Sequence, residues 1–531
     1  MRTNAIYAAK ARVRPLDDKY LACDPLPDPT NERDLTTFIT LWKEDQDKNL
    51  HQAVSNAQIA ENVIKEMQNI CGEALAMYDE KKLTWCREYT ELMREIELKK
   101  YDEVCAYILE FLETYTKLTP EEIAELKNSN KTRGKGDLTQ REKILLLENT
   151  KDLMFSLWGN VQGKSVMHKR IEFGPYEAAM PMNKATMQII FRCMWTSYDY
   201  LSPYKIQDDI VVGGVVDFQM YEYPKPCMKA HSKFIRSKVL TSFAEWVMRK
   251  VLPVHERLNK QPFPESAAGN AIETPVEVSF KIPPYLFIGD DITALKIGVW
   301  DSNKGEWSTD YIAFGKEDSK KDSRQILFTT TKFAPMAMLQ SRCMDYPYQN
   351  WKLRCTKDDL AVLDLFTKRI KLVFEISPLT VRLVNCDIQE LQHLVNIDFQ
   401  PGYLLLELQK CGVNLMPRDE DAKLAGIELK DRAAEERAII DISNSVRAFH
   451  FRKAKWNQGV AAEEGIGSSQ VLIRLRENLD FDLDYLEDYE PDWRYVSWWQ
   501  DKCAFQAGCK DTDAQCQACL PDGQVTHALL S

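Results

Sequence analysis

Hydrophobic positions in the first third of the chain repeat with the period of a helix. From about residue 34 to residue 117, apolar residues recur three and four positions apart. One predicted face carries Leu92, Ile96, Tyr101, Val104, Ile108, Phe111, Leu112 and Tyr115. This spacing places apolar side chains along one side of a helix. The pattern predicts two or three long amphipathic helices, preceded by an extended segment that contains the prolines at 25, 27 and 29.

Two short motifs have the form of a helix start, in which a Thr side chain caps the first turn and a Glu three residues later caps the Thr in return. The first is Thr119-Pro-Glu-Glu122, and the second is Thr139-Gln-Arg-Glu142, which precedes the apolar run at 144–147. We expect a surface loop over residues 128–137 between them. After the second motif the pattern predicts a helix over residues 142–157.

Beyond Trp158 the pattern changes to runs of β-branched and aromatic residues, first at 188–195 and 209–221. Helical spacing returns at 237–257, and a linker follows at 261–275. Shorter strand-like runs then lie at 276–280, 295–300, 307–314, 324–330, 334–340, 351–354, 370–376, 380–384, 403–408 and 449–456. The turn residues at 301–305 predict a hairpin. Many short strands separated by turns favour an antiparallel sandwich, with a second β unit after it.

Together these patterns predict an α+β protein, because a region of long helices is followed by antiparallel β-sandwich-like units and an acidic-aromatic C-terminal segment. A chain of 531 residues is also longer than a single hydrophobic core usually supports. The predicted parts are an extended segment at 1–33, a helical region at 34–160, a mixed β/α region at 161–260, a β-sandwich-like domain at 272–356, a second β-rich unit at 366–478, and an acidic-aromatic, Cys-containing tail at 479–531.

Composition limits the classes of partner. Apolar residues make up 44% of the chain and charged residues 28%, as in folded proteins. The net charge of −11 argues against nucleic acid, whose binding depends on Lys and Arg at phosphates. No apolar run approaches the length that spans a bilayer, and the N-terminal residues lack the apolar core of a signal peptide. We therefore expect a cytoplasmic protein without a membrane partner.

Fourteen cysteines fit a reducing compartment, where most thiols remain free. Cys71, Cys86, Cys105 and Cys193 lie among apolar residues and are expected to be buried. Near the C-terminus, four thiols are close enough in sequence to suggest a zinc site: Cys503, Cys509, Cys516 and Cys519. The last pair has zinc-ligand spacing, whereas five residues separate the first pair and few apolar residues surround the group. A reduced, mobile tail is the alternative that we favour.

A second possible site is the sequence GNVQGKS at 159–165, which resembles a phosphate-binding loop. Only three residues separate its glycines, where the phosphate loop needs four, so its backbone amides would enclose too small a space. The predicted helix before it also disagrees with the strand that such a loop follows. A nucleotide-binding enzyme is thus kept as an alternative, and a zinc-bearing interaction module as another.

Catalytic motifs are missing from the sequence. Seven scattered histidines form no His-Glu-x-x-His pattern, and no Gly-x-Ser-x-Gly marks a nucleophile. We predict no catalytic residue and no cofactor. The basic cluster at 452–455 is interpreted as a solvated surface.

Acidic and aromatic residues alternate from 481 to 493, a composition that suits docking into a basic groove. Tryptophans are frequent anchors of protein interfaces, although they also pack inside their own domain. The candidate partner-binding residues are Trp42, Trp493, Trp498, Trp499, Asp484, Glu487 and Asp488.

Several strings match a known family in the same order along the chain: CDPLPDP at 23–29, FITLW at 38–42, LWGN at 157–160, VVGGV at 211–215, LKIGVW at 295–300, FAPMAMLQ at 333–340 and YQNW at 348–351. The chain thereby resembles the axonemal dynein intermediate chain seven family, also called cancer susceptibility candidate one. That family's long Lys/Glu-rich N-terminal extension has no counterpart here, so binding through it does not transfer. The Cys-containing C-terminus has no match in the family.

The resemblance implies a non-catalytic structural subunit of an axonemal dynein arm in the cytoskeleton of a cilium or flagellum. It implies contacts with axonemal dynein heavy and intermediate chains, with tubulin as a further candidate, and a role in ciliary beating. It implies no enzyme activity.

Overall fold

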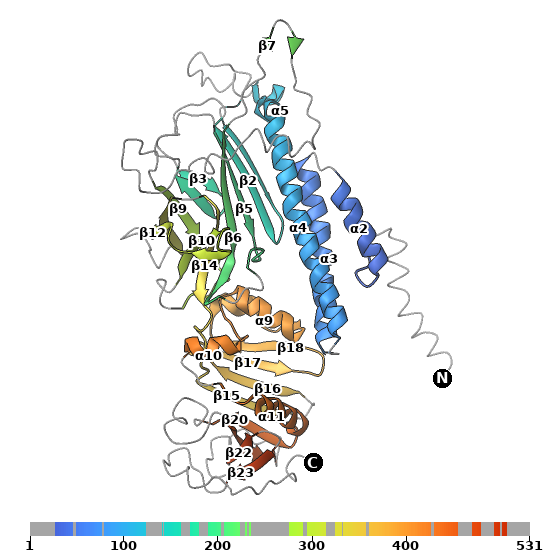
Figure 1. Cartoon of the computed structure of the whole chain (residues 1–531), viewed down its shortest axis with the longest axis vertical. Helices are drawn as coiled ribbons and strands as arrows, with labels where there is room; N and C mark the ends of the chain where they lie inside the picture. Colours follow the sequence, from blue (N-terminus) through green and yellow to red (C-terminus); the bar gives the residue numbers. More distant parts are fainter. Residues whose placement is uncertain are drawn as a thin grey trace, which may run out of the picture. The chain divides into compact units, whose positions relative to one another are not determined.

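Two compact units divide the chain: Met1–Phe155 with Glu222–Leu252, and Ser156–Tyr221 with Pro253–Ser531. The computed structural model in Figure 1 describes residues 27–45, 49–76, 79–123, 141, 143–160, 170–179, 189–202, 207–222, 229–230, 233–234, 275–289, 295–314, 324–331, 333–356, 360–425, 429–454, 470–478, 493–499 and 502–506. Helices come first and antiparallel sheets follow, which confirms the predicted α+β class. The boundaries of the six predicted parts stay a prediction.

Long helices dominate the first unit, as the apolar spacing predicted. They are α2 (Glu32–Glu44), α3 (Leu50–Ala76), α4 (Glu80–Glu110) and the short α5 (Leu112–Thr116). The Asn31 side chain caps α2 and the Asp79 side chain caps α4 by accepting backbone N–H groups. The first three helices lie side by side (Figure 1) and share one apolar core, which includes Ile39, Met67 and Ile96. This unit also contains the strands β7 (Lys229–Ala230) and β8 (Lys233–Phe234).

A buried lysine of α4 binds the C-terminal end of α2. The Lys100 side chain from α4 is only 3% exposed, and its ammonium donates to the backbone carbonyls of Lys43 and Asp45. Those carbonyls are among the groups that the end of a helix leaves without intrahelical partners. Lys100 therefore satisfies the C-terminus of α2 and joins it to α4.

The helix predicted over 142–157 is wrong, because this segment forms β1 (Lys143–Asn149) and β2 (Leu153–Asn160). Along β1 the buried Ile144 is followed by the exposed Leu145, and every residue of β2 is buried. A short apolar run does not by itself distinguish a strand from a helix. The motif at Thr119 does form, since the Glu122 side chain accepts the Thr119 N–H and the Thr119 hydroxyl accepts the Glu122 N–H.

A carboxylate from α3 holds the turn between β1 and β2. Glu61 accepts hydrogen bonds from the Thr150 hydroxyl and from the Asp152 backbone N–H. The Thr150 hydroxyl oxygen in turn accepts from the Leu153 backbone N–H at 2.9 Å, which closes the turn. Burial raises the pKa of Glu61 above its ordinary value.

Glu61→Gln tests this turn through the pH dependence of stability. Since the folded-state pKa is raised, the fold disfavours the ionised carboxylate, and stability is lost as pH rises from the unfolded through the folded pKa. Relative to the natural chain, the glutamine variant should gain stability between pH 4 and pH 7, because its side chain cannot ionise. Denaturant unfolding of the full chain at both pH values measures the difference. Glu61→Ala should lose about 1 kcal/mol even at pH 4, since it removes the acceptor. A stability difference between the glutamine variant and the natural chain that stays the same at pH 4 and pH 7 would contradict this prediction.

Two facing sheets form the sandwich of the second unit. Their strands are β3 (Arg170–Phe173), β4 (Tyr176–Ala179), β5 (Ile189–Thr196), β6 (Asp209–Glu222), β9 (Val276–Lys281), β10 (Lys296–Asp301), β11 (Glu306–Ser308), β12 (Ile312–Phe314), β13 (Gln325–Thr330) and β14 (Pro335–Ser341). One sheet has the order β2-β5-β6-β14-β10-β11 and the other β12-β13-β9-β4-β3. The predicted hairpin at 301–305 is confirmed, because β10 pairs antiparallel with β11.

Aromatic rings fill the space between these sheets. Phe218 from the first sheet stacks on Phe280 from the second at 6.4 Å, and Phe280 meets Phe328 edge to face at 5.0 Å. All three rings are nearly fully buried. The sandwich is thus held by interlocking side chains from both inner faces, with strands that begin well before the predicted domain at 272–356.

Gly214 lies where β6 approaches β5 too closely for a side chain. Its φ is +91°, and an added Cβ would lie 2.1 Å from the Thr196 carbonyl oxygen. The neighbouring Trp195 indole donates to the Gly213 carbonyl at 2.9 Å. The register of β14 against β6 shifts at this point, between Ala337 and Met338. The glycine thus permits an irregularity of β6 against the neighbouring strand.

Gly214→Ala should destabilise the chain by about 3 kcal/mol, through left-handed strain and a backbone clash together. Gly289→Ala is the matched control, because Gly289 has a φ of +77° but its nearest neighbours lie 3.9 Å from the added Cβ. The control should cost only about 1 kcal/mol. Thermal and denaturant unfolding measure both, and equal losses would show that the clash is relieved.

A nine-stranded antiparallel sheet forms the rest of the second unit, in the order β19-β18-β17-β16-β15-β20-β21-β22-β23. Its strands are β15 (Asn350–Cys355), β16 (Ala361–Phe366), β17 (Lys371–Ile376), β18 (Val381–Cys386), β19 (Asp398–Phe399), β20 (Phe449–Lys453), β21 (Gln470–Glu477), β22 (Arg494–Trp499) and β23 (Lys502–Gln506). The last two strands lie in the predicted tail, so at least this part of the tail is folded.

The same part of the chain contains the helical segments η4 (Gln389–Leu394), α9 (Pro401–Lys410), α10 (Asp419–Ala425) and α11 (Arg432–Ser445). The strand predicted at 403–408 is wrong, since this segment belongs to α9. Pro401 starts the helix, and Leu404 and Leu408, one turn apart, are its buried side chains. The core beneath α9 and the core beneath α11 each gather apolar side chains from alternate strand positions.

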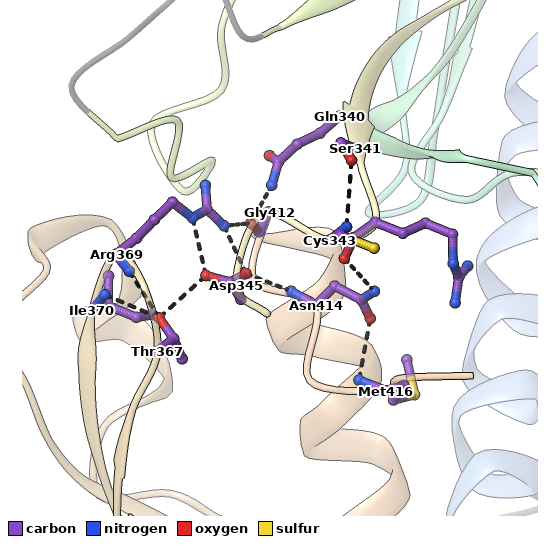
Figure 2. Close-up of polar contacts among 11 residues, drawn as sticks. Gln340, Ser341, Cys343, Asp345, Thr367, Arg369, Ile370, Gly412, Asn414 and Met416 are labelled. Carbon is purple, nitrogen blue, oxygen red and sulfur yellow. Dashed lines mark hydrogen bonds and ion pairs between the residues drawn. The ribbon is translucent and has the colours of Figure 1, made fainter. Parts of the chain in front are cut away.

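Buried polar groups join the sandwich to the nine-stranded sheet (Figure 2). Asp345, in the turn between β14 and β15, has a side chain that is 0% exposed, and its two oxygens accept from the Arg369 guanidinium at 3.0 and 2.7 Å. The same carboxylate accepts from the Thr367 hydroxyl and the Asn414 N–H. Arg369 also donates to the Gly412 carbonyl, which the Gln340 amide of β14 shares.

A second buried pair stands beside this network. Arg342 and Asp421 are 6% and 4% exposed, and their nearest nitrogen and oxygen are 2.8 Å apart. Asn414 links the two, because its backbone contacts Asp345 and its side chain donates to the Arg342 carbonyl. Hydrogen-bonded charges of this kind resist separation, so the passage from β14 into β15 is held in one geometry.

Candidate interaction surface

Two of the tryptophans proposed as partner anchors are core residues. Trp42 is 5% exposed and packs among the helices of the first unit, stacked on Phe38 at 5.9 Å. Trp498 is 0% exposed beneath α11, where its indole donates to the Asp441 carboxylate at 3.0 Å. Each of these rings packs inside its own domain, and a role of the two residues in partner binding stays a prediction.

Trp493 is also mostly covered, at 8% exposure, but its neighbours are charged. The guanidinium of Arg452 lies 4.4 Å from its ring centre, that of Arg476 5.5 Å and that of Arg474 6.0 Å. Arg474 also lies 5.4 Å from the Tyr495 ring. Trp493, a candidate chosen from the sequence, thus lies among arginine side chains. The side chain of Trp499 and the residues Asp484, Glu487 and Asp488 lie outside the described residues.

A shallow hollow opens beside Trp493. Its lining comprises Lys352, Leu353, Arg354, His450, Phe451, Arg476 and Trp493. Its empty space of about 280 Å³ includes space open to solvent, so the hollow is not an enclosed cavity. Drug-sized ligands usually occupy concave sites that bury most of their surface. This hollow therefore suits a side chain of a protein partner better than a free small molecule.

Sequence reasoning missed this surface except for its cluster at 452–455. The missed basic residues are Lys352, Arg354, Arg474 and Arg476, with His450 between them in the sheet. A signal was present, since basic residues alternate with leucines at 352–354 and at 474–476. Alternation places them on one face of each strand. The sequence did not show that the two strands share a sheet.

The structure describes only the first two residues of the sequence at 159–165 that resembles a phosphate-binding loop. Gly159 and Asn160 end the strand β2, so the argument from a preceding helix is wrong. Residues 161–165 lie outside the described part of the chain. The spacing argument is unchanged, because three residues still separate the two glycines.

Of the four candidate zinc ligands, the structure describes only Cys503. It is a free, buried thiol in the core under α11, and burial, followed by the nearby Asp441 carboxylate, raises its pKa to about 12. This position corrects the expectation of a mobile tail at Cys503, whereas Cys509, Cys516 and Cys519 lie outside the described residues. The described residues contain no group of three or more potential metal ligands.

Other described cysteines behave as buried thiols. Cys86, Cys105 and Cys193 are buried and free, which confirms the sequence prediction for these three; Cys71 is free but only partly buried. Burial raises the pKa of the Cys193 thiol well above its ordinary value. Among the residues that the structure describes, no helix combines the length and apolar character needed to cross a membrane.

One cysteine lies beside a histidine. The sulfur of Cys411 is 3.8 Å from His393 Nε2, and His393 Nδ1 is 2.8 Å from the Glu390 carbonyl oxygen. Because that carbonyl can only accept, Nδ1 carries the proton and Nε2 accepts from the thiol. Burial raises the pKa of Cys411 to about 12, so the thiol is protonated at neutral pH. This arrangement is a structural contact without an activated nucleophile.

The fold and its polar contacts define an α+β protein whose prominent buried polar groups hold parts of its second unit together. Comparisons with known proteins point to one family. A family model described as "Cancer susceptibility candidate 1 N-terminus" matches residues 4–133. Dynein axonemal intermediate chain 7 of Bos taurus is 21% identical over 87% of this chain and 74% of its own length.

Other relatives have the same name. Dynein axonemal intermediate chain 7 of Homo sapiens is 19% identical over 87% of this chain and 74% of its own length. The Dynein axonemal intermediate chain 7 homolog of Ciona intestinalis is 24% identical over 38% of this chain and 26% of its own length. The resemblance to the dynein axonemal intermediate chain 7 family is therefore confirmed.

Proposed function

We propose that the protein is a non-catalytic structural subunit of an axonemal dynein arm. The observation that carries this proposal is the similarity over 87% of the chain to relatives named dynein axonemal intermediate chain 7. In this role it would bind dynein heavy and intermediate chains, with tubulin as a further partner, and support ciliary or flagellar beating. Its place would be the axoneme within the cytoplasm.

The described residues support a binding role through their rigidity. A buried polar network fixes the sandwich against the nine-stranded sheet, and the helical unit has its own core. Rigid surfaces lose little conformational freedom when a partner binds, which favours affinity. Cys411 lies beside His393, but burial raises the pKa of its thiol to about 12. The thiol therefore stays protonated, and this pair offers no activated nucleophile of the kind that would favour an enzyme.

Cross-linking mass spectrometry on isolated axonemes tests the proposal. A tagged full-length chain expressed in ciliated cells should enter the axoneme and cross-link through its lysines to dynein heavy or intermediate chains. A tubulin cross-link would establish the further partner. A chain that is excluded from the axoneme, or that cross-links to no dynein subunit there, would overturn the proposal.

A further inference from the structure

Two cysteines lie in one apolar core on neighbouring helices. Cys71 of α3 packs against the core of the first unit, and Cys86 of α4 is a member of it. Cys86 is 2% exposed, whereas Cys71 is partly buried, and both thiols are free. Two thiols in the same core have a reaction that a single buried thiol lacks, because their sulfurs can join in a disulfide if the backbone geometry permits.

The chain reverses direction tightly between these helices. α3 ends at Ala76 and α4 begins at Glu80, and the Asp79 N–H donates to the Ala74 carbonyl at 2.9 Å. The Asp79 side chain then caps α4 by accepting from the Lys82 N–H. The two helices are therefore antiparallel neighbours, which lie side by side in Figure 1 and share a core.

Both cysteines stand at nearly the same height in this hairpin. Cys71 is five residues before the last residue of α3, and Cys86 is six residues after the first residue of α4. At a rise of about 1.5 Å per residue, they lie about 7.5 Å and about 9 Å from the turn. Axes of packed helices are about 8–10 Å apart, so cysteines at facing positions can reach the Cα separation of about 4.4–6.8 Å that a disulfide requires.

The ionisation of the two thiols supports this proximity. Burial raises the pKa of Cys86 to about 11, the nearby Cys71 thiol raises it further, and Lys82 lowers it. Burial also raises the pKa of Cys71. One thiol has this effect on another only at short range. Both thiols are protonated at neutral pH, so their closeness, and no special activation, favours a reaction between them.

The surrounding core accepts a disulfide more readily than a thiolate. Its members near the same turns of α3 and α4 include the apolar side chains of Met67, Ile70 and Met93. An apolar setting penalises a charged sulfur, whereas a disulfide is uncharged and requires no hydrogen bond. The oxidised pair therefore suits this core without a new polar partner.

We propose that Cys71 and Cys86 form a reversible disulfide when the chain meets a peroxide, which clamps α3 to α4. Cys71 reacts first because it is the more accessible thiol. The peroxide O–O bond breaks, an S–O bond forms at Cys71, and one water leaves, which gives a sulfenic acid. The Cys86 sulfur then attacks that sulfur, and the S–O bond breaks to release a second water. The two thiols lose two electrons in total, which the peroxide gains.

The bridge closes a loop from residue 71 to residue 86, so it limits the freedom of the unfolded chain and stabilises the helical unit. A dithiol reductant returns both thiols by exchange. The disulfide requires no dynein subunit, so it goes beyond the proposed function, and either can fail without the other.

Peptide mapping of the purified full chain after treatment with hydrogen peroxide is the test. Remaining thiols are blocked with N-ethylmaleimide, and the chain is digested with trypsin without reductant. Cleavage at Lys and Arg yields the peptides 66–81 and 83–87, each with one cysteine. They should appear as one linked species that dithiothreitol separates. The oxidised chain should unfold about 5 °C higher than the reduced chain.

Substitutions identify the thiols that react. In Cys86→Ala the linked species should be missing, and Cys71 should be recovered as a sulfenic or sulfinic acid. Cys105→Ala is the matched control, because Cys105 is 1% exposed on the same helix but about 28 Å further along it. This control should form the linked species like the natural chain. Circular dichroism checks that both variants are folded.

Three results with the natural chain would overturn the inference. The first is oxidation of Cys71 to sulfinic acid without any linked species. The second is a linked species whose yield rises with protein concentration, which would place the bridge between two chains. The third is a linked species that forms only in denaturant, which would show that the folded helices keep the sulfurs apart.

Discussion

Replacing Asp345 with alanine is expected to lower the free energy of unfolding by about 3–5 kcal/mol, because the change leaves the Arg369 guanidinium buried without its counter-charge. The Arg369 side chain is 12% exposed, and the Asp345 side chain is 0% exposed. The Asp345→Ala substitution also removes the acceptor for the Thr367 hydroxyl and the Asn414 N–H. Denaturant unfolding of the full chain measures it.

The matched control is an ion pair of the same type on the surface of the same sheet. Arg382 and Asp398 are 39% and 55% exposed, and their closest atoms are 2.8 Å apart. Asp398→Ala should cost less than about 1 kcal/mol, since solvent replaces the lost partner. In the Asp345→Ala, Arg369→Ala double variant, the total loss should be smaller than the sum of the single losses, because the two groups interact. An Asp345→Ala variant as stable as the Asp398→Ala control would refute a structural role for the network.

Trp498→Ala should cost about 3–5 kcal/mol, as expected when a large buried ring is removed from a core. Trp498→Phe separates packing from hydrogen bonding, because it keeps most of the apolar contact but removes the indole N–H that Asp441 accepts. We expect the phenylalanine variant to lose about 1–2 kcal/mol, since Asp441 still accepts from Arg437 at 3.1 Å. Thermal unfolding and tryptophan fluorescence measure both changes.

This prediction also decides between two roles for Trp498. A partner anchor could be replaced with little effect on the stability of the isolated chain, whereas a core residue could not. If Trp498→Ala left stability unchanged while axonemal incorporation fell, the ring would be a binding residue and its burial would not describe the functional state. From the structure we expect Trp498→Ala to lower the stability of the chain, and any loss of axonemal incorporation to follow from that lower stability.

Secondary structure could be predicted where a long or strongly patterned segment was available. The helices α2 to α4 followed from apolar spacing over many turns, and strands such as β6 and β9 followed from β-branched and aromatic runs. The helix wrongly predicted across β1 and β2 and the strand wrongly predicted within α9 each contain a short run of leucine. Leucine has no strong preference for a strand, and its contacts in the fold determine whether such a run becomes a strand or a helix.

The candidate surface was predictable only in fragments. Trp493 was selected from the sequence as an aromatic residue near acidic ones, but its arginine neighbours come from β20 and β21, and the hollow beside it also includes β15. About 140 residues separate Lys352 from Trp493 along the chain. Their proximity depends on strand register, which local pattern does not specify across such distances.

By itself, the sequence determined the fold class, the long N-terminal helices, the free buried thiols and the family that the chain resembles. These properties depend on local periodicity, on residue type, or on strings that can be matched directly. Tertiary structure alone decided that Trp42 and Trp498 lie in cores, that Asp345 joins two sheets, and that basic residues from three strands share one face. The physical reason is that burial and charge proximity are set by contacts between distant segments, and those contacts exist only once the sheets have paired.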